Sequence, residues 1–129
     1  METPAKRLVL CIDDERIGLR VRKLLLERAG YEVLTAPDGV SGLACFEQHP
    51  IEAVLLDYSM PGMDGGEVAA QMRRSKPNVP ILLLSAYVGL PAEIDGLVDG
   101  YLTKADDADT LLARLQSLLA GESPARGRA

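Results

Sequence analysis

The chain has 129 residues, 47% of them hydrophobic and 26% charged, with a formal net charge of −5. These values are typical of one globular domain with an ordinary core. The acidic balance and the low aromatic content of 4% argue against direct nucleic-acid binding. The amino end lacks the apolar stretch of a signal peptide, and no apolar run reaches the ~18 residues of a membrane span. We therefore expect a cytoplasmic protein without membrane insertion.

Short apolar runs alternate with longer amphipathic segments along the chain. Runs that are apolar on both faces are typical of central strands in a parallel sheet, whereas the mixed run at 31–36 indicates an edge strand. The segments between them have helical periodicity. In chain order, the sequence predicts a strand at 7–12, a helix at 15–29, a strand at 31–36, a helix after Asp38, a strand at 53–57, a helix at 65–74, a strand at 81–85, a strand at 100–104 and a helix at 106–120.

The helical segments carry signals for their buried faces and ends. In the first, Ile17, Val21, Leu24, Leu25 and Arg28 recur at near-helical spacing and predict the face turned to the core. Gly30 suits the end of that helix, and Asp38 suits the start of the next. The last helix has a strong leucine stripe (Leu111, Leu112, Leu115, Leu118, Leu119).

Alternating strands and helices of these lengths predict an α/β fold, with a doubly wound parallel sheet covered by helices on both faces. In such sheets the functional groups gather where the carboxyl ends of the strands meet the following loops. Residues 1–120 are expected to form this domain. The polar residues 121–129 are expected to form a flexible tail.

Polar residues follow four of the predicted strands at this edge: Asp13 and Asp14, Asp57, Ser85, and Lys104. Two carboxylates about 4 Å apart repel by ~4 kcal/mol at an effective dielectric constant near 20. The cluster must therefore hold protons, bind a cation, or both. Hard oxygen ligands favour Mg²⁺. With that charge neutralised, Asp57 could attack a phosphoryl group and form an acyl phosphate, which Lys104 and Ser85 would stabilise.

Four motifs, LVLCIDDE, VLLDYSMPGMDGGEVA, ILLLSA and GYLTK, occur in this order within residues 7 to about 120. With them the sequence resembles the receiver domain of two-component response regulators. The resemblance implies a flavodoxin-like fold with strand order 2-1-3-4-5. It also implies a histidine kinase or phosphotransfer protein as phosphodonor, an unknown downstream protein effector, and a monomer or weak dimer.

The resemblance also implies roles for single residues. Asp57 matches the phosphoacceptor, and Asp14 matches a direct Mg²⁺ ligand together with Asp57 and the backbone carbonyl of Ser59. Asp13 matches an acid that acts on the metal through water, and Lys104 matches the lysine that pairs with the phosphoryl group. Ser85 and Tyr101 match the hydroxyl and aromatic residues that switch together after phosphorylation. Such a chain would catalyse its own phosphorylation and dephosphorylation and would not be a turnover enzyme.

Two features depart from the family pattern. Ala105 stands where the family usually has proline after the lysine, so we predict a trans Lys104–Ala105 bond. Lys104 comes only 19 positions after Ser85, and the segment between them contains Gly89 and Gly96. We therefore expect its helix to be short or irregular, with Ile94, Leu97 and Val98 as its buried stripe.

Other functions use similar residues or the same fold. A small phosphatase with an aspartyl phosphate would need a second Asp two residues after its nucleophile, and Glu15 stands two residues after Asp13. A flavin carrier would need a phosphate loop where this chain has the acidic DDERIG. A receiver fold that never takes phosphate is a further alternative. Only GESPARGRA follows the last helix, so the output comes through a partner unless the sequence is part of a longer protein.

Overall fold

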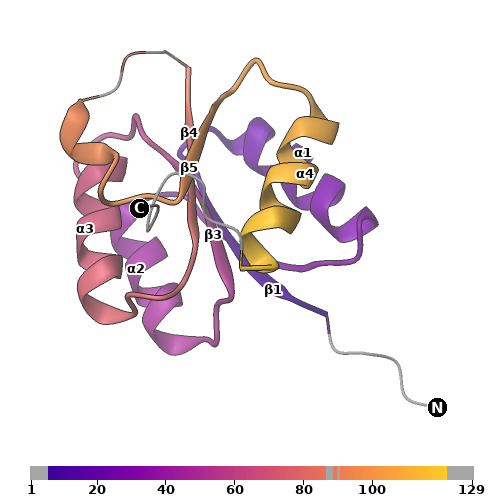
Figure 1. The fold of residues 1–129 in the computed structure, drawn as a ribbon, viewed down its shortest axis with the longest axis horizontal. Coiled ribbons are helices and arrows are strands. Elements are labelled where there is room, and N and C mark those ends of the chain that lie inside the picture. The colour runs from indigo at the N-terminus through magenta and orange to yellow at the C-terminus, as the bar shows by residue number, and fades with distance from the viewer. Residues whose placement is uncertain (1–5, 87–88, 90, 122–129) are drawn as a thin grey trace.

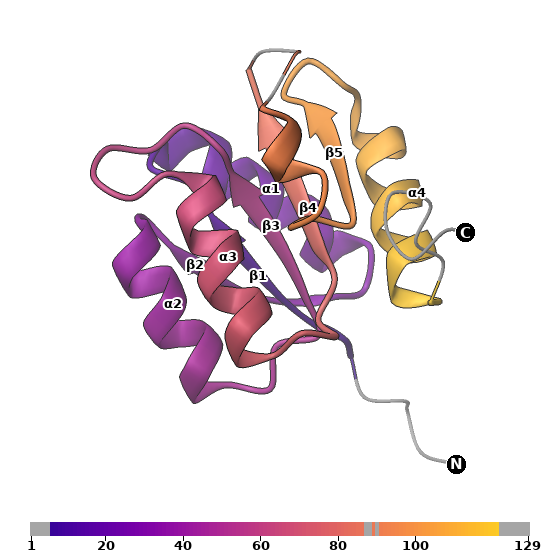
Figure 2. The same cartoon turned by 60° about the vertical axis from the view of Figure 1, so that its left-hand side comes forward.

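Five strands form one parallel sheet in the computed structural model, which describes residues 6–86, 89 and 91–121. They are β1 (Leu8–Ile12), β2 (Glu32–Ala36), β3 (Ala53–Asp57), β4 (Ile81–Ser85) and β5 (Gly100–Thr103). Their order is β2-β1-β3-β4-β5, with every pair parallel (Figure 2). The predicted fold class and strand order are confirmed.

Helices cover both faces of the sheet. They are α1 (Arg16–Arg28), α2 (Gly39–Gln48), α3 (Gly65–Ser75) and α4 (Ala108–Leu119), with a short 3-10 helix η1 (Ala92–Ile94). Figure 1 shows α2 and α3 on one side of the sheet and α1 and α4 on the other. None of these helices is long and apolar enough to cross a bilayer.

Strand alternation divides the core into two layers. In β1, Leu10 and Ile12 pack with α2 and α3, whereas Val9 and Cys11 pack with α1 and α4. Because successive strand residues point to opposite faces, a strand covered on both sides must be apolar at every position. For this reason β3 and β4 are buried throughout and are apolar up to their last residues. Those last residues, Asp57 and Ser85, are polar and lie at the carboxyl edge of the sheet.

Short polar side chains begin three of the four helices. Asp38, Asp64 and Asp107 each accept a hydrogen bond from the backbone N–H three residues later, which satisfies a donor that the helix leaves unpaired. Gly30 follows α1 with a φ of 102°, as its predicted place at the helix end requires. The cap predicted at Asp38 is confirmed.

Most of the predicted buried face of α1 is wrong, although Leu25 is half-buried and packs against the core. Ile17, Val21 and Leu24 are exposed, and Leu19 and Leu26 face the sheet instead. The two sets lie on opposite sides of the helix and both repeat at helical spacing, so periodicity alone could not choose between them. Arg22 lies between Leu19 and Leu26 on the inward face, and its charge concealed this stripe in the sequence.

The helix expected between β4 and β5 is reduced to the single turn η1, as predicted. Ile94 and Val98 are buried, and Leu97 packs beside them. Arg73 of α3 holds this segment by donating to the carbonyl of Leu97 at 2.8 Å and pairing with the buried Asp99. All peptide bonds among the described residues are trans, including Lys104–Ala105.

Candidate functional site

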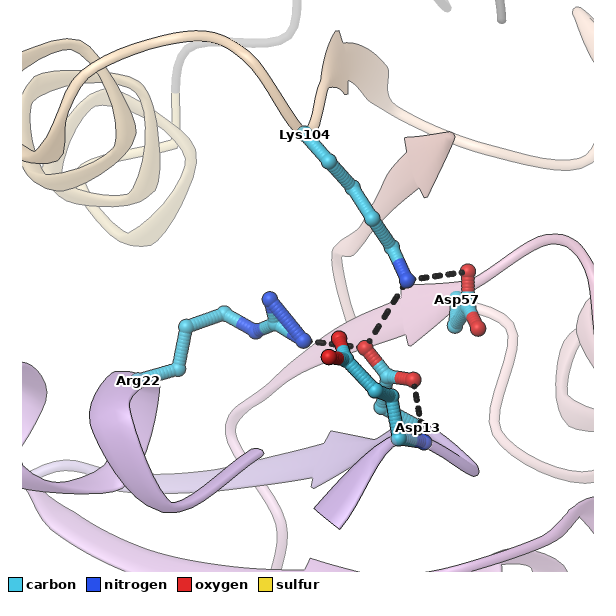
Figure 3. Close-up of polar contacts among 5 residues, drawn as sticks. Asp13, Arg22, Asp57 and Lys104 are labelled. Atoms are coloured by element: carbon cyan, nitrogen blue, oxygen red, sulfur yellow. Dashed lines mark hydrogen bonds and ion pairs between the residues drawn. The ribbon is translucent and has the colours of Figure 1, made fainter. Parts of the chain in front are cut away.

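The carboxyl ends of β1, β3 and β5 bring charged side chains together at one edge of the sheet. Asp57 is the last residue of β3, while Asp13 and Lys104 each directly follow their strand. Figure 3 shows the Lys104 side chain reaching toward both acids and Arg22 approaching Asp13. Sequence position alone predicts that Asp13, Asp57 and Lys104 meet, because parallel strands share this edge.

The Asp57 carboxylate is buried and has few partners that could stabilise its negative charge. Its residue is 2% exposed, and Oδ1 lies 3.1 Å from Nζ of Lys104. Beyond this ion pair, neither oxygen accepts a hydrogen bond from the residues that the structure describes. Burial and the neighbouring charge of Asp13 raise the pKa of Asp57 to about 6, although Lys104 opposes the shift. These oxygens are therefore available to a ligand.

Asp13 is equally buried but has several partners. Its Oδ1 accepts from the N–H of Glu15 at 2.9 Å, and its Oδ2 lies 3.1 Å from Lys104 and pairs with Arg22. Burial would raise the pKa of Asp13, but these hydrogen bonds and charges outweigh it and lower the pKa. Asp13 is therefore held ionised beside Asp57.

Lys104 connects the two buried acids. Its backbone N–H donates to the carbonyl of Ser85 at 2.7 Å, which fixes the chain just beyond β5. Its Nζ lies 3.1 Å from oxygens of both Asp13 and Asp57. Burial lowers the pKa of Lys104, but the two carboxylates outweigh this and raise it. A cation is thus held where it can contact a group bound to Asp57.

Asp13, Asp14 and Asp57 form a candidate metal site. One carboxylate oxygen from each lies within 4.8 Å of the other two, and Asp14 is the exposed member. Oxygen donors of this kind suit Mg²⁺, which binds through few protein ligands and retains water. The Asp57 oxygens, which accept no hydrogen bond from the part of the chain that the structure describes, also fit a cation. The donor set therefore fits the expected metal.

The other predicted site residues lie on β4, on β5 and in the loop after β3. Ser85 ends β4 and is buried, and Tyr101 lies on β5 with 49% of its surface exposed. Ser59 is exposed in the loop after β3. Arg22 was not predicted as a site residue. Its one signal in the sequence was its place between Leu19 and Leu26, two leucines at helical spacing.

The loop after β3 returns close to the site. A Cβ on Gly65 would lie 2.7 Å from the backbone oxygen of Asp57, so a larger residue there would push α3 away from β3. Gly62 has a φ of 81°, a conformation that L side chains rarely adopt. These glycines let α3 begin directly beside Asp57.

The sequence matches the family described as "Response regulator receiver domain" over residues 9–116. This chain belongs to the response regulator receiver domain family. The receiver domain is 37% identical over 122 residues to the response regulator MprA of Mycobacterium sp. (strain KMS), covering 92% of this chain and 53% of MprA. It is 35% identical over 116 residues to the transcriptional regulator RpaA of Synechocystis sp., covering 86% of this chain and 48% of RpaA.

Solved receiver structures are also similar to this receiver domain. A CheY-like receiver domain protein from Methanospirillum hungatei has a TM-score of 0.86 at 26% identity, covering 91% of this chain and 96% of that one. TrrA from Thermotoga maritima, solved in complex with Mg²⁺ and BeF, has a TM-score of 0.83 at 33% identity, covering 87% and 98%. The chain spans about half the length of the curated relatives it matches.

Proposed function

We propose that the receiver domain accepts a phosphoryl group on Asp57 from a histidine kinase or a phosphotransfer protein. A carboxylate oxygen of Asp57 attacks phosphorus, the bond from phosphorus to the donor's imidazole nitrogen breaks, and that nitrogen retains the electron pair. The observation that carries the proposal is the buried Asp57 carboxylate, which is free of hydrogen bonds from the described residues and faces Lys104. Such an oxygen is a ready nucleophile once it is ionised.

We further propose that Asp14, Asp57 and the carbonyl of Ser59 bind Mg²⁺ directly, with Asp13 acting through water. When bound, Mg²⁺ would neutralise charge on the transferring phosphoryl oxygens. Lys104 would pair with a phosphoryl oxygen, because its Nζ already lies 3.1 Å from Asp57. The Ser85 hydroxyl would donate to another, since Ser85 ends the neighbouring strand. The same groups would later assist hydrolysis of the acyl phosphate, so the chain acts on itself and not on a separate substrate.

The output would be a change of surface. Movement of Ser85 toward the phosphoryl group would free space for the half-exposed Tyr101, which would alter the surface around β5 and η1. We propose that an unknown effector protein binds this surface in the cytoplasm, that the domain is a monomer or weak dimer, and that it does not itself contact nucleic acid or insert into a membrane. The name of RpaA describes a DNA-binding regulator, but this chain corresponds to only part of that protein.

Phosphorylation can be tested with acetyl phosphate and Mg²⁺, followed by intact mass. Wild type should gain one phosphoryl group, and Asp57→Asn should gain none. Asp95→Asn, the same change at an exposed acid, should behave as wild type. Equal labelling of wild type and Asp57→Asn would place the acceptor elsewhere and contradict the proposal.

A further inference from the structure

Arg22 is a cation on the inward face of α1. It lies between Leu19 and Leu26, the residues through which the helix packs on the sheet, and its side chain is 15% exposed. Arginine is seldom this buried without a partner. Figure 3 shows its guanidinium directed at Asp13 from the side opposite Asp57. The position of Arg22 is thus set by an ion pair within the candidate site.

The ion pair with Arg22 gives Asp13 a contact that Asp57 lacks. Asp13 meets Arg22 and Lys104 through the same oxygen, Oδ2, while its other oxygen accepts a backbone hydrogen bond. Asp57 has the Lys104 ion pair on one oxygen and no hydrogen bond from the described residues on either. A metal that needs Asp13, directly or through water, must therefore share that carboxylate with a resident guanidinium.

The surroundings of Arg22 leave it room beside Asp13. Gly18 lies one helical turn earlier, and a Cβ there would lie 3.4 Å from Nη2 of Arg22 and 2.8 Å from a carboxylate oxygen of Glu15. Arg22 also lines a cavity of about 330 Å³ between α1, β5 and α4, together with Leu25, Lys104 and Leu111. Arg22 therefore borders both Asp13 and this cavity.

We propose that Arg22 is a positioning residue and resident counter-ion of Asp13, which holds the carboxylate in place without metal and weakens Mg²⁺ binding. The inference rests on the proposed magnesium site. A guanidinium on Asp13 repels a divalent cation that lies beside the same carboxylate, and in a largely buried site this repulsion is little screened. Mg²⁺ binding then requires the guanidinium to yield part of its contact with Asp13. Arg22 sets the Mg²⁺ concentration at which the site fills.

Calorimetric binding of MgCl₂ to metal-free protein tests this. Arg22→Gln and Arg22→Met both remove the charge, and Met also keeps an apolar chain of similar length on the inward face. We expect both to bind Mg²⁺ roughly three- to tenfold more tightly than wild type. Arg22→Lys, which keeps the charge, should stay within about twofold of wild type. Arg20→Gln is the matched control, because Arg20 is an exposed residue of the same helix.

Thermal unfolding provides a second measurement. Without metal, Arg22→Gln should unfold at a lower temperature than wild type, because Asp13 loses one of its cations. Added Mg²⁺ should raise its melting temperature more than that of wild type, since tighter binding stabilises the folded state more at the same concentration. A purely structural role would lower stability without strengthening Mg²⁺ binding.

The possible failures are distinguishable. If wild type binds Mg²⁺ and is phosphorylated on Asp57, but neither Arg22→Gln nor Arg22→Met binds Mg²⁺ more tightly, the inference is wrong and the proposed function stands. Equal strengthening by Arg20→Gln would also overturn it, because the effect would then come from net charge. If neither wild type nor the variants bind Mg²⁺, the magnesium site is wrong and the inference falls with it.

Discussion

Asp13 and Asp57 are the same residue type at the same sheet edge, yet their surroundings give them different properties. Asp13 has a backbone donor and two cations, which lower its pKa despite burial. Of these partners Asp57 has Lys104 alone, and burial and the Asp13 charge raise the pKa of Asp57 to about 6. One acid is thus kept as a fixed charge, while the other changes protonation near neutral pH.

This difference predicts how stability depends on pH. Because the pKa of Asp57 is raised on folding, its contribution is fully present below about pH 4 and is lost as pH rises through about pH 6. Asn does not titrate in this range, so Asp57→Asn should not lose stability as pH rises. In metal-free buffer, urea unfolding should show Asp57→Asn to be more stable than wild type by about 3 kcal/mol near neutral pH, with the gap closing toward about pH 4.

The control for this measurement is Asp109→Asn, which makes the same substitution at an exposed position of α4. Because the side chain of Asp109 is exposed, Asp109→Asn should not reproduce a stabilisation that grows with pH. A gap between Asp57→Asn and wild type that stayed constant with pH would mean that the Asp57 carboxylate titrates normally in the folded protein.

At the scale of elements, the segment between β4 and β5 is held by side-chain contacts in place of a full helix. The guanidinium of Arg73 donates to the carbonyls of Leu97 and Val79 at 2.8 and 2.9 Å and pairs with Asp99. Asp99 in turn accepts from the N–H of Ile81 at 2.8 Å. These contacts connect α3, the start of β4 and the segment after η1.

We therefore expect Arg73→Met to lower the free energy of unfolding by about 3 kcal/mol, because it leaves Asp99 buried without its cation. Amide exchange at Ile81 and Asp99 should become faster, since both amides lie in this network. Arg74→Met is the matched control, because Arg74 is the exposed next residue of α3 and should change stability by less than about 0.5 kcal/mol. A similar loss in both variants would show that removing either arginine charge, and not the network around Asp99, destabilises the fold.

At the scale of the whole molecule, the features that the sequence predicted correctly follow from strand pattern. Runs that are apolar on both faces predicted the parallel sheet, and parallel strands bring Asp13, Asp57 and Lys104 to one edge. The orientation of α1 and the role of Arg22 were not predictable in this way. Both depend on which of two apolar stripes of α1 packs on the sheet. The stripe that packs there contains Arg22, and the partner of this charge, Asp13, becomes apparent only when the helix is placed against the sheet.

The proposed switch links the buried site to the outer surface through β4 and β5. Ser85 and Tyr101 lie on these paired strands, one buried and the other 49% exposed. Addition of Mg²⁺ and beryllofluoride should therefore reduce the solvent exposure of Tyr101. Fluorine NMR of fluorotyrosine-labelled protein can follow this, with Tyr101→Phe to assign the signal and Tyr31, which packs against the α1 and α4 layer, as an internal reference.

Asp57→Asn should abolish the change in the Tyr101 signal, because the mimic would have no carboxylate to bind. Ser85→Ala should retain binding of the mimic but reduce the change at Tyr101, since the hydroxyl is the proposed connection between them. If Tyr101 became buried to the same extent in Ser85→Ala, the coupling would run through another part of β5. If the Tyr101 signal stayed constant in wild type with the mimic bound, the output surface would lie elsewhere on the domain.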